Sequence, residues 1–160
     1  MPAITQLTKH FRAVHFGGNW ASSSVKEHLE GLTWQQATTQ IADFNTIATL
    51  NFHINYYVSA VAKVLAGEAL VAKDALSFDH PPITCQADWD QMVAKTLADA
   101  ETFANLLAKL PAEQLWEDFT DPKYSNYYAN IHGIIEHTHY HLGQLVLIKK
   151  MVLAKTNQEK

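Results

Sequence analysis

The chain has 160 residues, of which 48% are apolar and 18% charged, with a formal net charge of −4 and a single cysteine. These values predict one globular domain spanning residues 1–160 and argue against a disordered, collagenous or disulfide-stapled protein. The absence of a basic run disfavours nucleic-acid binding. No stretch is apolar enough to span a bilayer, no signal-peptide pattern opens the chain, and Cys85 has no internal partner. We therefore expect a cytoplasmic protein that does not associate with membranes.

Apolar residues recur at helical spacing in four long stretches of the chain. This periodicity predicts helices over residues 4–16, 36–66, 88–110 and 127–154. Thr33 and Gln36 have the spacing of a capping box at the start of the second helix, and Gly67 is placed to stop that helix. Ser24 and Glu27 have the same spacing and predict a short additional helix.

The third predicted helix begins at Asp88, which can form a cap with Gln91, and it ends at Pro111. No segment shows a strand pattern of comparable strength. Four amphipathic helices in a chain of this length predict an all-α fold, namely a four-helix bundle. The long connection over residues 67–84 allows a crossover between helices that are not adjacent.

Nine histidines are an unusually large number for a chain of this length. His137 and His141 are four residues apart in the fourth predicted helix, so both imidazoles lie on one face and can reach one ion. About 0.5 pairs with this spacing arise by chance in such a chain, so the helical register has to decide. Projected at about 100° per residue, both histidines fall within about 60° of Ile134 and therefore point into the bundle.

His53, in the second predicted helix, lies at the edge of the apolar stripe in line with Leu50 and Tyr57. It is the natural third ligand, because one histidine from one helix and a pair from another can occupy three corners of a tetrahedron. His132 and His139 fall on a different side of the fourth helix, and we predict that they are surface or interface residues.

The same three histidines also allow a simpler interpretation as core residues. Buried histidines commonly bond to a carbonyl or a tyrosine, and several tyrosines are available: Tyr56, Tyr57, Tyr127 and Tyr128. Three histidines converging from two apolar faces would be costly to leave unpaired, and metal coordination satisfies them together. Spacing and register alone leave both interpretations open.

Residues 137–144 read H-T-H-Y-H-L-G-Q, and the pattern H-x-x-x-H-x-G-Q resembles that of the DinB-like (DinB/YfiT-like) superfamily. In that superfamily a histidine on the second long helix completes a three-histidine site, and His53 stands at the corresponding place in the segment N-F-H-I-N-Y-Y. The resemblance covers nearly the whole chain. It implies a four-helix bundle in which His53, His137 and His141 bind a divalent metal ion, usually zinc or nickel, often in a homodimer.

The resemblance also implies chemistry on a small-molecule substrate. Relatives include S-transferases that use low-molecular-weight thiols and a thiol-dependent isomerase, while others are assigned as hydrolases of unknown substrate. Three neutral imidazoles leave the full charge of an ion at the site, where it can ionise a thiol or acidify a water. We therefore predict a metal-dependent enzyme of the thiol S-transferase or hydrolase type. A non-catalytic metal-binding or structural bundle is the alternative.

Three further residues are candidates for supporting roles. Gln144 lies one turn beyond His141 and could orient that ligand, although helix packing explains it equally well. Asn55 and Tyr57 could line the approach of the substrate, and core packing is the competing explanation. The sequence identifies no catalytic residue besides the metal ligands, and we do not expect Cys85, in a proline-rich connection, to be the nucleophile.

The fourth predicted helix carries a second apolar stripe beside the first one. The stripe is broader than one bundle core normally covers, and it consists of Ile135, Leu142, Val146 and Leu153. A second copy of the chain would cover it, so the sequence predicts a homodimer.

Overall fold

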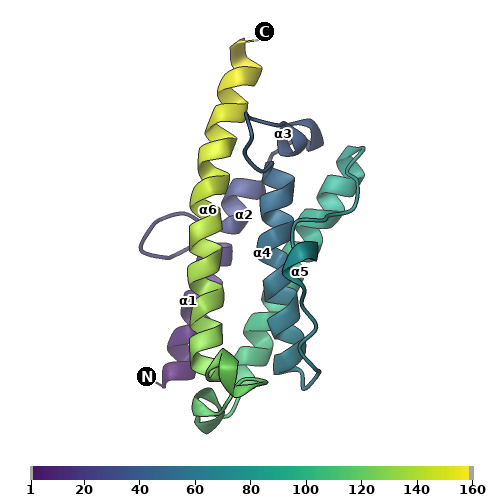
Figure 1. Ribbon diagram of the computed structural model, residues 1–160. Helices are drawn as coiled ribbons and strands as arrows, with labels where there is room; N and C mark the ends of the chain where they lie inside the picture. The colour runs from purple at the N-terminus through teal and green to yellow at the C-terminus, as the bar shows by residue number, and fades with distance from the viewer. Residues whose placement is uncertain (1, 159–160) are drawn as a thin grey trace.

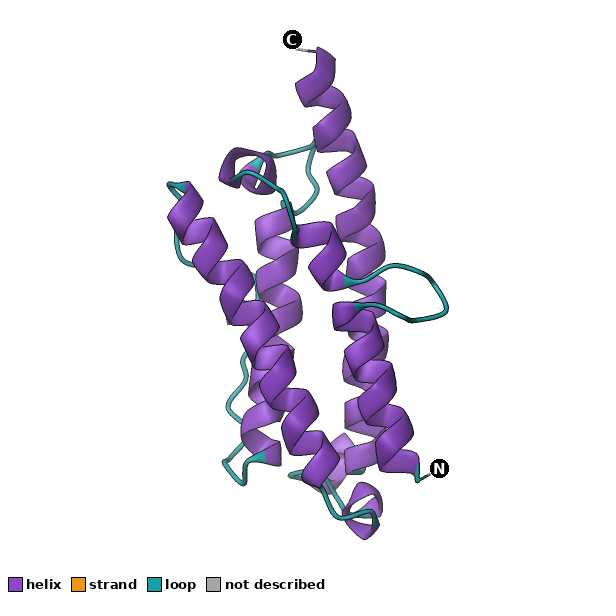
Figure 2. Ribbon diagram, turned by 180° about the vertical axis from the view of Figure 1, so that it is seen from behind, coloured by secondary structure: helices purple, strands orange, loops and turns teal. Residues whose placement is uncertain are grey.

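The computed structural model describes residues 2–158, and every regular element in that range is helical. The α-helices are α1 (Ala3–Phe16), α2 (Val25–Leu29), α3 (Trp34–Thr38), α4 (Ile47–Leu65), α5 (Gln86–Lys109) and α6 (Tyr127–Gln158). Three short 3-10 turns lie in the connections: η1 (Asp74–Leu76), η2 (Glu113–Trp116) and η3 (Pro122–Tyr124). Figure 2, coloured by secondary structure, contains only helices and loops. The predicted all-helical fold is confirmed.

The four long helices lie side by side, with α1 and α6 running in one direction and α4 and α5 in the other (Figure 1). Both α5 and α6 pack against α4 and against α1. The helices α4 and α5 are parallel because residues 66–85 return along α4 to the far end of the bundle before α5 begins. This return segment, called the crossover below, is the long connection that the sequence predicts.

The second predicted helix is two helices in the structure, so its prediction over residues 36–66 was wrong. The predicted capping box of Thr33 and Gln36 forms, but it starts the short helix α3. Ala42 then adopts a φ of 45°, which lies outside the helical region. A new helix, α4, begins only after Thr46, whose hydroxyl accepts a hydrogen bond from the backbone N–H three residues further on. This second cap determines where the helix that carries His53 starts.

The third long helix starts earlier than predicted. Its first residue is Gln86, and Asp88 acts from inside the first turn, not as the cap itself. The Asp88 carboxylate accepts the backbone N–H groups of Thr84 at 2.8 Å and of Cys85 at 3.2 Å. The helix ends just before Pro111, as predicted, because proline cannot continue the hydrogen-bond ladder.

Two hydrophobic clusters fill the bundle. One includes Phe11 and Phe103, whose rings stack with centroids 4.1 Å apart. The other includes Trp89 and Leu145. Among the described residues, no helix is long and apolar enough to cross a membrane.

The second apolar stripe of α6 is mostly buried within the chain itself. Ile135 is 1% exposed and Leu142 is 3% exposed, one in each hydrophobic cluster. They are covered because α6 contacts several other helices, including α1, α2, α3 and α4. The stripe therefore leaves little apolar surface for a second copy of the chain, and the reason for predicting a homodimer from it was wrong.

Candidate metal centre

Three histidines from two helices converge at the interface between α4 and α6. His53 comes from α4, and His137 and His141 come from successive turns of α6. The Nε2 atoms of His53 and His137 are 3.0 Å apart, and one ring nitrogen of each of the three residues lies within 4.8 Å of the others. No other group of three or more His, Cys, Asp or Glu side chains in the described part of the chain has this proximity. The predicted convergence is therefore present.

The crossover determines the orientation of the His53 ring. His53 Nδ1 lies 3.3 Å from the carbonyl oxygen of Ser77 and 3.1 Å from its hydroxyl oxygen. The hydroxyl itself donates to the carbonyl oxygen of Asp74 at 2.7 Å, so its oxygen is free to accept. Since a carbonyl oxygen only accepts, Nδ1 of His53 carries the proton. The lone pair is then on Nε2, which faces His137.

Gln144 determines the orientation of His141 in the same way. Its Oε1 lies 2.7 Å from Nδ1 of His141. An amide oxygen only accepts, so Nδ1 carries the proton and Nε2 keeps its lone pair. A partner of this kind on the second ring nitrogen is typical of histidines that bind metals. The contact between Gln144 and His141 is the geometry that the sequence suggested.

His137 is the least satisfied of the three side chains. Its Nδ1 is buried without a hydrogen-bond partner in the described structure. Burial lowers the pKa of His137 to about 4, and the neighbouring His141 and His53 act in the same direction. Burial, followed by the effect of His141, also lowers the pKa of His53. Both rings are therefore neutral at pH 7, which is the form that binds a metal.

The donor set fits a divalent metal ion of the zinc type. Imidazole nitrogens bind zinc at about 2.0–2.1 Å, which places two ligand atoms of a tetrahedral site about 3.3 Å apart. The His53–His137 separation of 3.0 Å is close to that value, and the largest separation, 4.8 Å, is within the reach of side-chain rotation. Two Nε2 atoms that face each other can share at most one proton while both rings are neutral, and a cation between them satisfies both lone pairs.

Aromatic side chains surround the histidines. Phe78, from the crossover, stacks on the His53 ring with centroids 3.8 Å apart and an interplanar angle of 10°. The edge of Tyr57 contacts His53 and His137, with centroid distances of 5.2 and 4.9 Å. Tyr140 contacts His141 at 4.8 Å. These contacts contribute to the burial of His53 and His141, which are 5% and 9% exposed, and burial strengthens electrostatic interactions at the site.

A cavity of about 500 Å³ borders the site on the side of His137. It is open to solvent and is lined by α4, the crossover, the segment that follows η2, and the first turns of α6. Tyr57 lines this cavity, as the sequence suggested for a residue on the substrate path. The structure does not place Asn55 there: its amide donates to Asp99 at 2.8 Å, and it lines a different cavity between α4 and α5.

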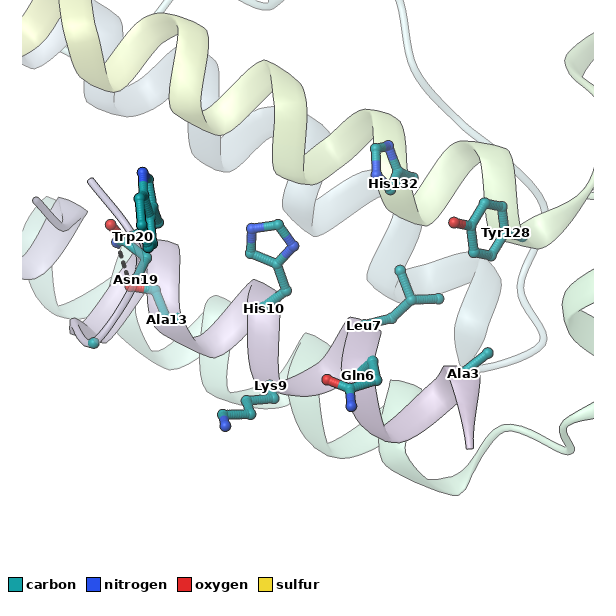
Figure 3. Close-up of a pocket in the computed structure, with 11 residues that line it drawn as sticks. Ala3, Gln6, Leu7, Lys9, His10, Ala13, Asn19, Trp20, Tyr128 and His132 are labelled. Carbon is teal, nitrogen blue, oxygen red and sulfur yellow. Dashed lines mark hydrogen bonds between the residues drawn. The ribbon is translucent and has the colours of Figure 1, made fainter. Parts of the chain in front are cut away.

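The remaining histidines of α6 face away from this site. Figure 3 shows His132 pointing from α6 toward α1, where His10 points back across the gap between the two helices. His10 also approaches His139, with ring centroids 5.9 Å apart. His132 pairs with the exposed Glu136 at 3.2 Å. His132 and His139 are only partly exposed and lie beside α1 of the same chain, so a position at solvent or at a partner chain stays a prediction. Cys85 is exposed at the start of α5.

The sequence did not predict that residues of the crossover contact the histidine site. Ser77 and Phe78 contact His53 directly, and Asp74 accepts the hydroxyl of Tyr57 at 2.8 Å. The crossover has no periodic pattern that would indicate which of its residues faces a helix. The only local signal is the three-residue spacing of Asp74 and Ser77, which form one 3-10 turn.

A model of the DinB superfamily matches residues 19–145 of the chain. The match covers more than half of the sequence and includes all three histidines, so the chain belongs to the DinB superfamily. No curated protein and no solved structure matches the chain.

Proposed function

We propose that the chain is a metal-dependent enzyme in which His53, His137 and His141 hold a divalent ion, with zinc or nickel as the expected metals. The observation that carries the proposal is the convergence of these three ring nitrogens beside a cavity, with no fourth protein ligand in the group. A structural zinc site is closed by four protein ligands, whereas a catalytic site keeps one position for water or substrate.

The bound ion would supply a Lewis-acid centre that lowers the pKa of a thiol or a water at its open position. The protein positions the ligands and excludes solvent: Ser77 and Gln144 hold the protons of His53 and His141 on Nδ1, and Phe78 covers His53. In an S-transferase, the thiol sulfur would form a bond to an electrophilic carbon, the leaving group would depart with its bonding electrons, and the thiol proton would pass to solvent. In a hydrolase, water would take the place of the thiol.

A non-catalytic metal-binding or structural role is the alternative. It predicts a closed site or histidines that bind no metal. The cavity of about 500 Å³ next to His137 favours the enzyme, because a purely structural site needs no space for a small molecule.

The test is the metal content of protein expressed without a polyhistidine tag, measured by inductively coupled plasma mass spectrometry. We expect nearly one zinc or nickel ion per chain in the wild type. His53→Ala and His137→Ala should lose the metal, whereas His139→Ala, on the other face of α6, should retain it. Circular dichroism would verify that each variant is folded. A wild type that contains no metal and takes up neither zinc, nickel, iron nor manganese would overturn the proposal.

We also propose that the enzyme is a cytoplasmic homodimer. Support comes from exposed apolar side chains on the outer face of α6, namely Tyr140 at 65%, Leu147 at 52% and Met151 at 36% exposure. At about 100° per residue they fall within about 40° of one another on the helix. Such a stripe is apolar surface that a second copy of the chain would bury.

A further inference from the structure

The cavity beside His137 carries a negative charge. Among the residues that line it, Asp74 is the only one with a carboxylate, and none is a lysine or an arginine. Most of the other walls are apolar or aromatic, with Leu70 and Phe119 among them. A ligand that enters this space therefore meets one fixed negative charge and no fixed positive charge from the protein side chains.

Asp74 is exposed to solvent and is connected to the proposed metal centre through Tyr57. The Tyr57 hydroxyl donates to Oδ1 of Asp74 at 2.8 Å, while the same ring contacts His53 and His137. The carboxylate thus lies about one tyrosine side chain away from the histidines. Its second oxygen, Oδ2, accepts no hydrogen bond or ion pair from any described residue. One acceptor of a charged group therefore remains available to a ligand.

Three aromatic rings line the same cavity: Tyr57, Phe119 and Tyr124. Aromatic faces attract cations through their quadrupole, and a carboxylate beside such faces is a typical environment for an ammonium group. The ring of Tyr124 already accepts one, because Nζ of Lys123 lies 4.8 Å from its centroid. Lys123 is itself paired with Asp121 at 3.2 Å and does not line the cavity.

We propose that this cavity selects substrates that carry a primary ammonium group and no carboxylate. The ammonium group donates to Oδ2 of Asp74 and contacts the surrounding aromatic rings. The apolar body of the substrate lies along Leu70 and Phe119, and its reacting end points toward His137. The position of that reacting end rests on the proposed function, whereas the ammonium site rests on Asp74 and the aromatic lining alone.

An anionic group is disfavoured at the same place for a physical reason. A carboxylate in the cavity would lose hydration, gain no cationic side chain as a partner, and experience repulsion from Asp74. Selectivity then comes from the attraction of a ligand ammonium group to Asp74 and the repulsion of a ligand carboxylate by it. At the Asp74 end of the cavity, away from the proposed ion, amine-bearing thiols or amine-bearing electrophiles are favoured over thiols with several carboxylates.

The test measures binding of three probes of similar size to metal-free protein by NMR titration: phenethylamine, 2-phenylethanol and phenylacetate. We expect phenethylamine to bind most tightly and phenylacetate least. Asp74→Asn should weaken phenethylamine binding about tenfold and leave 2-phenylethanol binding unchanged. Asp79→Asn is the matched control, because it removes the same charge from an exposed residue of the crossover that does not line the cavity. It should leave all three affinities unchanged.

Three results would overturn the inference: equal affinity for the amine and the carboxylate probe, unchanged amine binding in Asp74→Asn, or an equal loss in Asp79→Asn. Metal content separates this inference from the proposed function. Metal binding without amine selectivity refutes only the ammonium site, whereas amine selectivity in a protein that binds no metal refutes only the enzyme. If Asp74→Asn lowers zinc affinity but not amine affinity, Asp74 balances the charge of the metal and the inference is wrong.

Discussion

The Nε2 atoms of His53 and His137 face each other at 3.0 Å, although the two residues are 84 positions apart in the chain. Neither nitrogen has any other hydrogen-bond partner in the described structure. His141 completes the group from the next turn of α6. The arrangement brings one ring nitrogen of each histidine to a common region between two helices, and the predictions below test what these nitrogens bind and what holds them in place.

Metal binding should stabilise the folded chain by mass action. At a free zinc concentration about 100 times the dissociation constant, the gain is about 2.7 kcal/mol. For a chain of this size, this corresponds to a rise in Tm of roughly 5–10 °C over chelator-treated protein. Differential scanning calorimetry of the wild type and of His141→Ala would measure it. Should His141→Ala gain as much as the wild type, zinc binds elsewhere.

Gln144 should set the affinity of the site through His141. Its Oε1 accepts the Nδ1 proton of His141 at 2.7 Å. Loss of the hydrogen-bond partner of a metal ligand typically lowers metal affinity by about 10- to 100-fold. Gln144→Ala should therefore weaken zinc binding in a competition titration with a chromogenic chelator. Gln144→Glu, which keeps an acceptor oxygen at the same length, should restore most of the affinity. Equal affinities in all three proteins would reduce Gln144 to a packing residue.

Acid should destabilise the metal-free protein through His15. Burial, the largest cause, lowers the pKa of His15 from 6.5 to about 4 in the folded state. Between these values the unfolded chain binds a proton that the folded chain does not, so the free energy of unfolding falls as the pH drops from 6.5 to 4. The full effect of this one group is about 3 kcal/mol. His137 contributes in the same direction.

Urea unfolding at several pH values, with a chelator present, would measure this dependence. His15→Gln should reduce the slope of the free energy of unfolding against pH, between pH 6.5 and 4, by the contribution of one bound proton. His80→Gln, in the crossover, is the control and should keep the slope of the wild type. An unchanged slope in His15→Gln would show that His15 becomes charged in the folded state without cost.

The cap at Thr46 should stabilise the helix that carries His53. Its hydroxyl accepts the backbone N–H of Thr49 at 3.1 Å, and Thr46→Ala should lower the free energy of unfolding by about 1 kcal/mol. Thr102→Ala, an exposed position inside α5, should be neutral or slightly stabilising, because alanine is the better helix former. If Thr46→Ala also proved neutral, α4 would not depend on this cap.

Sedimentation should show a mass of about twice 18.0 kDa at micromolar concentrations if the exposed stripe of α6 joins two chains. Leu147→Lys places a charge at the centre of that stripe and should shift the protein to the monomer. Lys150→Glu, also exposed on α6 but outside the stripe, should remain dimeric. A mass of about 18.0 kDa for the wild type over the same concentrations would contradict the dimer.

The sequence alone was sufficient to predict which helix faces carry the three clustered histidines. The 3.6-residue period places His137 and His141 on one side of α6 and His132 and His139 elsewhere, and this relation holds whatever packs against the helix. The same period identified His53 on the helix that becomes α4. Helix faces are predictable because they depend on residues within a few positions of one another.

Helix ends were less predictable than helix faces. The break between α3 and α4 arises because this stretch contains two N-caps. Thr33 starts α3, and Thr46 starts α4. Periodic apolar residues on either side could not show that the chain leaves the helix at Ala42. Likewise, Ile135 and Leu142 looked like a surface for a partner, because the sequence does not show how many helices surround α6.

Only the tertiary structure decided what completes the site. Ser77 and Phe78 reach His53 from the crossover, and Asp74 reaches Tyr57 beside it. The path of the crossover depends on how far apart the ends of α4 and α5 lie in the folded bundle. A connection without periodicity carries no information about which of its residues will face a helix. The chain sequence therefore determined the three candidate ligands, through local helical geometry, whereas packing between distant segments decided the partner of His53, the ring that covers it and the charge of the neighbouring cavity.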